Sequence, residues 1–359
     1  MATVVLAGGG TAGHIEPALA VARAWKLAHP DDVMVFIGTK AGLENKLVPS
    51  AGFTLAHIPK VQISRRPSLS WFRIPFDLYR AVASSRVLLK DAQLLIGFGG
   101  YVSAPAYLAA RMIKTPILIH EANAKPGWAN RLGAKLTPYL AVANRIDKGD
   151  FANARITGLP LRSDVLEAFM ASRLDFPAAR LAAKRRLGFD EEKPLVFIMG
   201  GSQGSITINK VVEECLPNLL AKGISILHST GKLNSLPKEM DGYRPVAYVD
   251  AMGDAYLASD LVISRSGAVT CSEFRALGRY ALFVPLPIGN GEQLYNARSL
   301  IEESRAEVVE QSNFNSQYLV SHIDNLLQNA SKSRVDGSDV DLAAAEKIVA
   351  LGEFAVSQL

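Results

Sequence analysis

The sequence is poor in cysteine and has no apolar run long enough to cross a bilayer. Its two cysteines, Cys215 and Cys271, lie far apart and in no metal-ligand spacing. Two lone thiols argue against a disulfide framework and suggest a reducing compartment. No stretch approaches about 18 uninterrupted apolar residues, so no membrane span is expected. Glycines interrupt the first apolar run by residue 8, and no basic region precedes it, so a secretory signal is not expected.

Charged residues are also scarce, and they are unevenly divided. They make up 20% of the 359 residues, against 49% hydrophobic residues, which is typical of a globular chain with two domains. Residues 1–160 contain 19 Lys and Arg against 9 Asp and Glu, whereas residues 161–359 contain 20 against 25. The basic first half therefore suggests an anionic partner, which could be a phosphate-bearing substrate, a membrane surface or a nucleic acid.

Short apolar runs alternate with helical patterns along the whole chain. Strands are predicted at 4–7, 33–37, 94–96 and 117–120, and a second series begins in "PLVFIMGGSQGS" (194–205). The second series continues through "SILHSTG", "RPVAYVD", "LVISRSG" and "YALFVPLP". Strands separated by helices indicate βαβ units and a parallel sheet. A surface linker is predicted at 329–339.

The two series open alike, since "VVLAGGGTAGH" and "LVFIMGGSQGS" are each a strand that runs into a glycine loop and then a helix. This similarity predicts two doubly wound, Rossmann-like α/β domains. The expected bounds are 1–160 for the first domain and 161–340 for the second. A C-terminal helix is expected at 341–359, and the pattern leaves open whether it packs back on the first domain.

The first glycine loop is typical of a phosphate-binding turn. Such a turn lets backbone amides at a helix start approach an anion closely. Gly8, Gly10 and Gly13 satisfy G-x-G-x-x-G, but a dinucleotide site also requires an acid after the second strand. That strand ends Ile37-Gly38-Thr39-Lys40, without a carboxylate. Lys40 could meet a 2′-phosphate instead, so an NADP enzyme remains an alternative. A P-loop is not present.

Four more glycine-containing loops follow predicted strands. They are "GFGGYVSAP" (97–105), "HEANAKPG" (120–127), "SRSGAVTCSE" (264–273) and "PIGNGEQLYNA" (287–297). Ligands of open α/β sheets bind at the carboxyl ends of the strands. With two such domains facing each other, a deep interdomain cleft is the expected site.

Taken together and in this order, these motifs resemble the MurG family of bacterial glycosyltransferases, in glycosyltransferase family 28. The resemblance covers residues 4 to about 300 and implies two domains of the GT-B type. It implies UDP-N-acetylglucosamine as donor and lipid I, undecaprenyl-pyrophosphoryl-N-acetylmuramoyl-pentapeptide, as acceptor. The product would be lipid II, with inversion at the anomeric carbon. The first domain would bind acceptor and membrane, and the second would bind the UDP-sugar.

The resemblance also implies which residues contact the donor. Asn123 would meet the sugar, Arg162 and Ser202 the diphosphate, and Val249 the uracil. Glu273 would bind the ribose hydroxyls and Gln293 a sugar hydroxyl. The remaining donor contacts would be Thr11, Ala12, Gly13, Ala268, Val269, Thr270, Cys271 and Ser272. Neither a metal nor a cofactor is expected, since no D-x-D motif among these loops suggests a metal-bound diphosphate.

The acceptor pyrophosphate would lie on the loop that contains Gly99, Gly100, Tyr101 and Ser103. A general base must take the proton of the acceptor hydroxyl. The two candidates are His14 and Glu121, and the sequence does not decide between them. The chain departs from the family pattern at Ala12, Glu16, Leu159 and Glu292, and the sequence alone gives no consequence for these changes.

A basic and aromatic segment at 60–90 favours a membrane surface as the anionic partner. It contains seven Lys and Arg, one acid, and Trp71, Phe72, Phe76 and Tyr79. Apolar side chains of such a segment can enter a bilayer surface while its cations meet anionic headgroups. Nothing that reads bases accompanies it, so no nucleic acid is expected. The predicted location is peripheral, at the cytoplasmic face of the cell membrane.

Three functions therefore remain to be compared. The first is a membrane-peripheral sugar transferase, the second an NADP-dependent oxidoreductase, and the third a non-catalytic protein that binds a sugar nucleotide.

Overall fold

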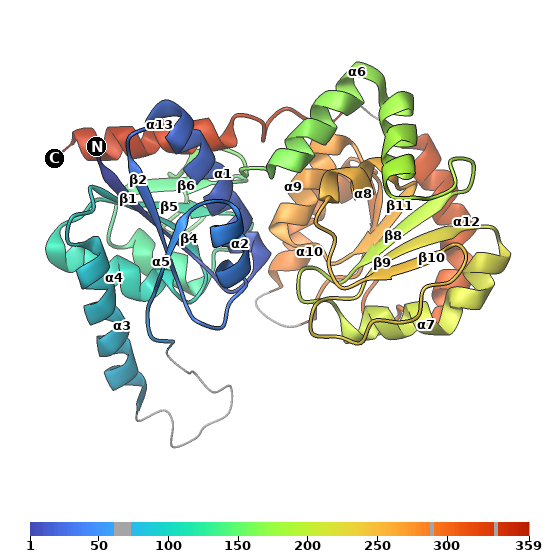
Figure 1. The fold of residues 1–359 in the computed structure, drawn as a ribbon, viewed down its shortest axis with the longest axis horizontal. Helices are drawn as coiled ribbons and strands as arrows, with labels where there is room; N and C mark the ends of the chain where they lie inside the picture. Colours follow the sequence, from blue (N-terminus) through green and yellow to red (C-terminus); the bar gives the residue numbers. More distant parts are fainter. Residues whose placement is uncertain (61–72, 288–290, 334–336, 359) are drawn as a thin grey trace. The chain divides into compact units, whose positions relative to one another are not determined.

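The computed structural model describes residues 1–60, 73–287, 291–333 and 337–358, which form two compact α/β units (Figure 1). The first unit consists of Met1–Arg162 together with Asp341–Leu359, and the second unit is Ser163–Val340. Each unit is built around one parallel sheet, so the predicted pair of Rossmann-like domains is confirmed. The cleft between them stays a prediction.

The sheet of the first unit has seven strands in the order β3-β2-β1-β4-β5-β6-β7. The order reverses between β1 and β4, because the chain first builds outward on one side and then crosses to the other. The strands are β1 (Thr3–Gly8), β2 (Val33–Gly38), β3 (Thr54–His57), β4 (Leu94–Gly99), β5 (Ile117–Glu121), β6 (Tyr139–Val142) and β7 (Arg155–Ile156).

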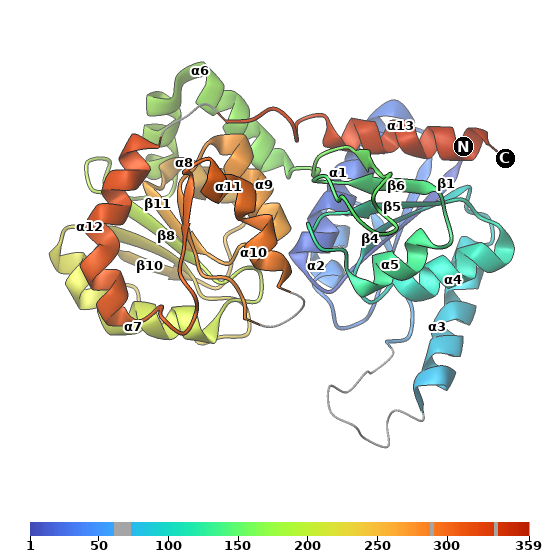
Figure 2. The same ribbon diagram turned by 180° about the vertical axis from the view of Figure 1, so that it is seen from behind.

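Helices cover both faces of this sheet because alternate side chains of its buried strands point to opposite sides (Figures 1 and 2). Val4 and Leu6 of β1 pack in a core with α1 and α13, whereas Val5 and Ala7 pack in a second core with α3 and α4. The helices of the unit are α1 (Ala12–Ala28), α2 (Glu44–Ser50), α3 (Ile74–Leu89), α4 (Ser103–Ile113), α5 (Trp128–Ala134) and α13 (Ala344–Ser357).

The C-terminal segment is part of the first unit rather than of the second, which precedes it in the chain. Helix α13 packs against α1 so closely that a Cβ on Gly352 would lie 2.8 Å from the Trp25 ring. The carboxylate of Asp341, in the connection before α13, accepts a 2.8 Å hydrogen bond from the Leu159 amide. These contacts return the chain to the sheet on which it began.

The sheet of the second unit repeats the arrangement with six strands in the order β10-β9-β8-β11-β12-β13. Its strands are β8 (Leu195–Met199), β9 (Ser225–Ser229), β10 (Tyr243–Val246), β11 (Leu261–Ser264), β12 (Ala281–Phe283) and β13 (Ala306–Val308). Its helices are α6 (Ser163–Arg186), α7 (Ile206–Ala221), α8 (Met252–Ala258), α9 (Ala268–Leu277), α10 (Glu292–Asn296), α11 (Arg298–Glu302) and α12 (Ser316–Lys332). Helix α6 is kinked at Asp175, where the backbone is not helical.

The two faces of the second sheet are packed differently. One face is mostly aliphatic, with Ile198 and Ile263 among the residues that pack with α7 and α12. The other face stacks aromatic rings, since Phe274 of α9 lies 5.2 Å from Tyr256 of α8 and 5.8 Å from Phe283 of β12, between ring centroids. This aromatic layer fixes α8 and α9, which both begin at the carboxyl edge of the sheet.

The predicted strands of both series are confirmed within a few residues. Strands β3, β6, β7 and β13 were not predicted, because they are short and lie toward the sheet edges. The predicted linker at 329–339 is wrong at its start, since α12 continues to Lys332 and buries Ala330. Among the helices of the described ranges, none combines the length and apolarity that a membrane span needs.

Candidate functional site

Both units end their two central strands in loops at the point where the strand order reverses. In the first unit these are the loops after β1 and β4, and in the second the loops after β8 and β11. This edge is where doubly wound sheets bind ligands. Gly8 of β1 pairs with Gly99 of β4 through a shift in register, so the two loops of the first unit start side by side.

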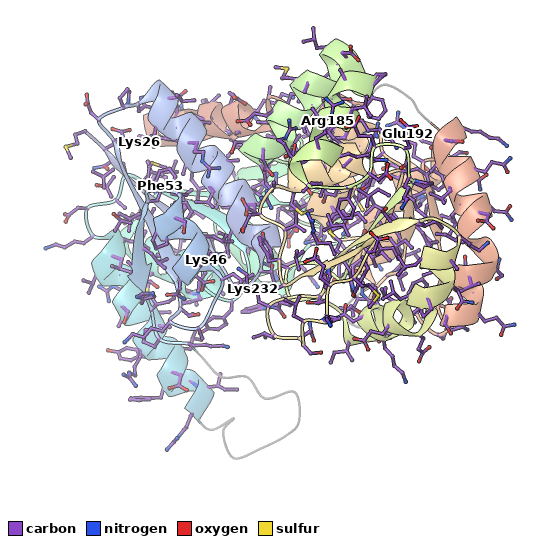
Figure 3. All side chains as sticks on the ribbon, turned by 45° about the vertical axis from the view of Figure 1, so that its right-hand side comes forward. Lys26, Lys46, Phe53, Arg185, Glu192 and Lys232 are labelled. Atoms are coloured by element: carbon purple, nitrogen blue, oxygen red, sulfur yellow. The ribbon has the colours of Figure 1, made fainter. Side chains whose placement is uncertain are left out.

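The first glycine loop already holds a carboxylate of its own chain. Glu44, the first residue of α2, is buried, and its Oε2 accepts a 3.0 Å hydrogen bond from the Gly10 amide. Its Oε1 accepts a 2.9 Å bond from the Thr39 amide and a 3.2 Å bond from the Thr39 hydroxyl. Lys46, labelled in Figure 3, marks α2 two residues further on. A carboxylate of α2, and not one directly after β2, therefore joins the turns after β1 and β2.

His14 lies in the first turn of α1 and is half-buried. Its Nδ1 lies 3.1 Å from the Thr11 hydroxyl, and a Cβ on Gly100 would lie 3.2 Å from the same nitrogen. The imidazole is thus next to the loop predicted to bind the acceptor. Burial lowers the pKa of His14, while a backbone hydrogen bond with Gly9 and the charge of Glu44 act in the opposite direction. The ring is accordingly neutral near pH 7 and can accept a proton.

The loop after β4 requires glycine at two adjacent positions. Gly99 and Gly100 have φ values of 90° and 79°, and a Cβ on Gly100 would lie 2.5 Å from the Gly9 carbonyl oxygen. Ser103, predicted to donate to the acceptor, is instead fully buried, with its hydroxyl 2.9 Å from the Ala7 carbonyl and 2.7 Å from that of Gly99. Its hydroxyl therefore ties the loops after β1 and β4 together.

Glu121, at the end of β5, is the centre of a hydrogen-bond network. Its carboxylate accepts bonds of 2.8 and 3.0 Å from the amide and side chain of Asn123, 2.9 Å from the Gly127 amide and 3.0 Å from the Asn130 side chain. Burial raises the pKa of Glu121, and these four bonds oppose the shift. The carboxylate thus organises the "HEANAKPG" loop and orients Asn123.

Arg162 closes the first unit and pairs with a residue at the start of α1. Its guanidinium lies 3.9 Å from the carboxylate of Glu16, and both side chains are mostly buried. Since Glu16 is one of the departures from the family pattern, this ion pair gives that departure a structural reason. Arg162 belongs to the first unit, although the sequence boundary assigned it to the second.

The second glycine loop, after β8, is backed by a buried cation. Ser205 caps α7 by accepting a 3.3 Å hydrogen bond from the Ile208 amide. The same hydroxyl accepts a 2.8 Å bond from Arg265, whose guanidinium also donates to the Val284 and Pro285 carbonyls at 2.8 and 3.1 Å. A further 2.6 Å bond reaches the Gln311 side chain. Burial lowers the pKa of Arg265.

The start of α9 carries most of the predicted donor contacts. Ala268, Val269 and Thr270 are half-buried, and Cys271, Ser272 and Glu273 are buried. Glu273 accepts a 2.7 Å hydrogen bond from the buried Tyr256 hydroxyl. Burial raises the pKa of the Cys271 thiol, which is therefore unreactive.

The other predicted donor residues lie at the same edge of the second sheet. Ser202 is in the loop after β8, and Val249 is buried in the segment between β10 and α8. Gln293 of α10 accepts a 2.9 Å hydrogen bond from the Leu286 amide, which fixes the segment after β12. The structure thus gathers the predicted residues into two groups, one in each unit.

Sequence reasoning missed Glu44, Asn130 and Arg265. Arg265 lies inside a loop that the sequence had singled out. Glu44 lies six residues after the end of β2, and the dinucleotide motif places its acid directly at the end of that strand. Within the part of the chain that the structure describes, no group of three or more His, Cys, Asp or Glu could hold a metal ion.

Comparisons with known proteins cover nearly the whole chain. Residues 4–148 match the glycosyltransferase family 28 N-terminal domain, and residues 195–350 match the family 28 C-terminal domain. A curated relative from Corynebacterium glutamicum (strain R) is 44% identical over 88% of this chain and 87% of its own length. One from Thermobifida fusca (strain YX) is 39% identical over 97% and 94%. Both are named UDP-N-acetylglucosamine--N-acetylmuramyl-(pentapeptide) pyrophosphoryl-undecaprenol N-acetylglucosamine transferase.

A solved structure leads to the same family. The crystal structure of Acinetobacter baumannii MurG is 26% identical, with a TM-score of 0.69 over 99% of this chain and 100% of that one. The matched domains, the relatives and the two doubly wound units agree, and this chain belongs to glycosyltransferase family 28.

Proposed function

We propose that this chain transfers N-acetylglucosamine from UDP-N-acetylglucosamine to lipid I, with inversion, and so makes lipid II for peptidoglycan. The observation that carries this proposal is the similarity to transferases of that name along nearly the whole chain. The reaction requires a site for an anionic donor and a site for a lipid-linked acceptor. The two switch points are the candidates for these two sites.

The donor diphosphate is assigned to the second unit. Helix N-termini and oriented amides stabilise phosphate, and a preorganised positive charge strengthens them. The buried guanidinium of Arg265 touches Ser205 at the start of α7 and the backbone after β12. The start of α9 would bind the β-phosphate and sugar, with Glu273 for the ribose and Gln293 for a sugar hydroxyl. Asn123, Arg162 and the start of α1 remain proposed donor contacts from the first unit.

The acceptor is assigned to the first unit, at Gly99, Gly100 and Tyr101. The acceptor oxygen would attack the anomeric carbon as the bond from that carbon to the β-phosphate oxygen breaks, and the bonding pair would leave with UDP. The hydroxyl proton would pass to a base. His14 is favoured because its ring is neutral and lies beside this loop. The oxygens of Glu121 already accept four hydrogen bonds.

The choice of base can be tested with His14→Gln. A neutral amide cannot accept the proton, so kcat should fall by about 100-fold or more, while KM for the donor stays near that of the wild type. Steady-state kinetics with a soluble lipid I analogue measure both values. A variant with near-normal turnover would remove His14 from the mechanism.

The function itself is tested by transfer of labelled N-acetylglucosamine to a lipid I analogue. Incorporation of label that depends on both substrates is the expected result. Donor binding without transfer would instead indicate a non-catalytic protein. Thermal-shift measurements with UDP-N-acetylglucosamine and with NADPH complete the test, and stabilisation by NADPH alone would overturn the proposal in favour of an oxidoreductase.

The membrane partner is assigned to α3 of the first unit. Phe76, Tyr79 and Val87 of this helix are 62, 72 and 76% exposed. The Arg80 guanidinium lies 5.7 Å from the Phe76 ring, so cation and apolar surface are adjacent. Figure 2 shows α3 extending away from the sheet of its unit. Residues 61–72 of the predicted segment, with Trp71 and Phe72, lie outside the described residues.

We therefore expect peripheral binding to anionic lipid, on the cytoplasmic face where the donor would be available. Replacing Phe76 and Tyr79 together by Ser should weaken sedimentation with anionic vesicles by about tenfold. Turnover of a soluble acceptor analogue should remain. Leu174→Ser is the matched control, since Leu174 is 90% exposed on α6 of the second unit. Equal losses in both variants, or binding to neutral vesicles alone, would contradict the assignment.

A further inference from the structure

Glu44 is a buried charged group that the proposed reaction does not use. Its side chain accepts hydrogen bonds from the amides of Gly10 and Thr39, in the turns after β1 and β2, and from the Thr39 hydroxyl. Among the described residues no lysine or arginine forms an ion pair with it. A buried carboxylate that is held by neutral donors alone retains its negative charge at a cost in solvation free energy. The energetic cost of burying this carboxylate therefore indicates that it has a role in the loop.

Three glycines make the space that this carboxylate occupies. A Cβ on Gly38 would lie 2.5 Å from the Cγ of Glu44, and one on Gly9 would lie 3.2 Å from its Oε1. A Cβ on Gly42 would overlap the carboxylate itself. The glycines come from the loop after β1, the end of β2 and the turn before α2. These three glycines therefore make room for a carboxylate of the chain itself and not for a bound anion.

The carboxylate occupies a backbone amide that a glycine loop can offer to a phosphate. In a dinucleotide-binding sheet the glycine loop after the first strand offers its amides to pyrophosphate. Here the Gly10 amide is already bonded, and the fixed negative charge repels a second anion. We propose that Glu44 is a positioning residue that fills the anion position of the first glycine loop. It thereby excludes phosphate from Gly10 and holds the loop in the shape that presents His14.

The second consequence of this role rests on the proposed function, because it concerns catalysis. His14 follows the loop directly and contacts Thr11. Glu44 is the charged group that acts on it, and its negative charge raises the pKa of His14 against the effect of burial. Loss of that charge should make His14 a weaker base. The acid limb of the kcat profile should then move to lower pH, since the ring would stay neutral further into acid.

The anion exclusion is tested by binding alone, without any transfer assay. The probe is inorganic pyrophosphate, titrated calorimetrically into protein that is saturated with UDP. Pyrophosphate should bind Glu44→Ala about tenfold more tightly than the wild type, because one repelling charge is removed and two amides are released. Asp32→Asn is the matched control. Asp32 also accepts a backbone amide, that of Ala2, at the opposite end of β1, and its variant should match the wild type.

Unchanged pyrophosphate affinity in a folded Glu44→Ala protein would overturn the proposal. This result is independent of whether the chain is a transferase, so it separates failure of the inference from failure of the function. If Glu44→Ala does not fold, Glu44→Gln keeps the shape of the side chain, removes the repelling charge and should bind pyrophosphate more tightly than the wild type in the same titration. An affinity equal to that of the wild type would again count against the role of Glu44.

The catalytic consequence is tested with Glu44→Gln, which keeps the shape and removes the charge. Its kcat should fall by about tenfold, its acid limb should move to lower pH, and KM for UDP-N-acetylglucosamine should change less than about twofold. A purely structural role would not move the pH profile. A Glu44→Gln enzyme with the wild-type kcat and pH profile would overturn the role toward His14, and a loss of donor affinity would show that the Glu44 carboxylate supports donor binding instead.

Discussion

The two glycine loops occupy the same place in two similar sheets, yet opposite charges lie behind them. After β1 the Gly10 amide is bonded to the carboxylate of Glu44, whereas after β8 the cap of α7 is bonded to the guanidinium of Arg265. The two backbones are alike, since each loop has glycine at positive φ. Backbone geometry therefore makes a glycine loop able to bind an anion. The sign of the buried charge behind the loop determines whether that anion is attracted or repelled.

The largest effect is expected from Arg265→Gln in the second unit. This change removes the charge behind the loop and leaves carbonyl acceptors without their donors, so kcat/KM for UDP-N-acetylglucosamine should fall by about 100-fold or more. The measurement is steady-state kinetics with varied donor. Arg180→Gln is the control, since Arg180 pairs with Asp260, whose carboxylate holds the amide of Leu195, the first residue of β8, and so lies at the other end of that strand. Equal losses of kcat/KM in both variants would remove the distinction between the loops.

Acid should destabilise both units, since each contains a histidine that is fully buried in its fold. In the first unit His120 faces the Gly158 carbonyl, and in the second His228 lies 2.9 Å from the Tyr243 hydroxyl. Burial lowers the pKa of each histidine to about 4. The unfolded chain binds these protons below its own pKa of about 6.5, before the folded protein does. Stability is therefore lost as pH falls from about 6.5 to 4, by about 3 kcal/mol for each histidine.

Urea denaturation between pH 7 and pH 4 measures this loss. His228→Phe should flatten the pH dependence of the transition of the second unit, and His120→Phe should do so for the first. A pH slope that survives both substitutions would assign the acid sensitivity to other groups.

The smallest effect is expected at one open glycine in each loop. Gly10 and Gly201 have φ values of 89° and 86°, and a Cβ at either position would meet nothing within 4 Å. Alanine at each should therefore cost only the strain of the left-handed backbone, about 1 kcal/mol in unfolding free energy. Chemical denaturation of both variants measures it. A cost at Gly10 several times that at Gly201 would reveal a constraint on the first loop that its contacts do not explain.

Much of the candidate site could be predicted from the sequence because its residues follow buried strands directly. The carboxyl ends of parallel strands meet at one edge, so Gly99 and Glu121 at strand ends, and His14 in the helix turn that follows β1, are brought to one edge of the first unit. What the side chains do there could not be predicted in the same way. The Ser103 hydroxyl bonds the loops after β1 and β4 to each other, and the Glu121 carboxylate fixes the loop that follows β5.

The sequence by itself determined the alternation of strands and helices, the two glycine loops and the family, since each depends on residues that are neighbours in the chain. Only the tertiary structure decided that α13 returns to the first sheet, that Arg162 pairs with Glu16, and which charge lies behind each loop. Glu44 and Arg265 act on segments 34 and 60 residues away. Contacts of this kind depend on how segments far apart in the chain pack together, so a local sequence pattern does not predict them.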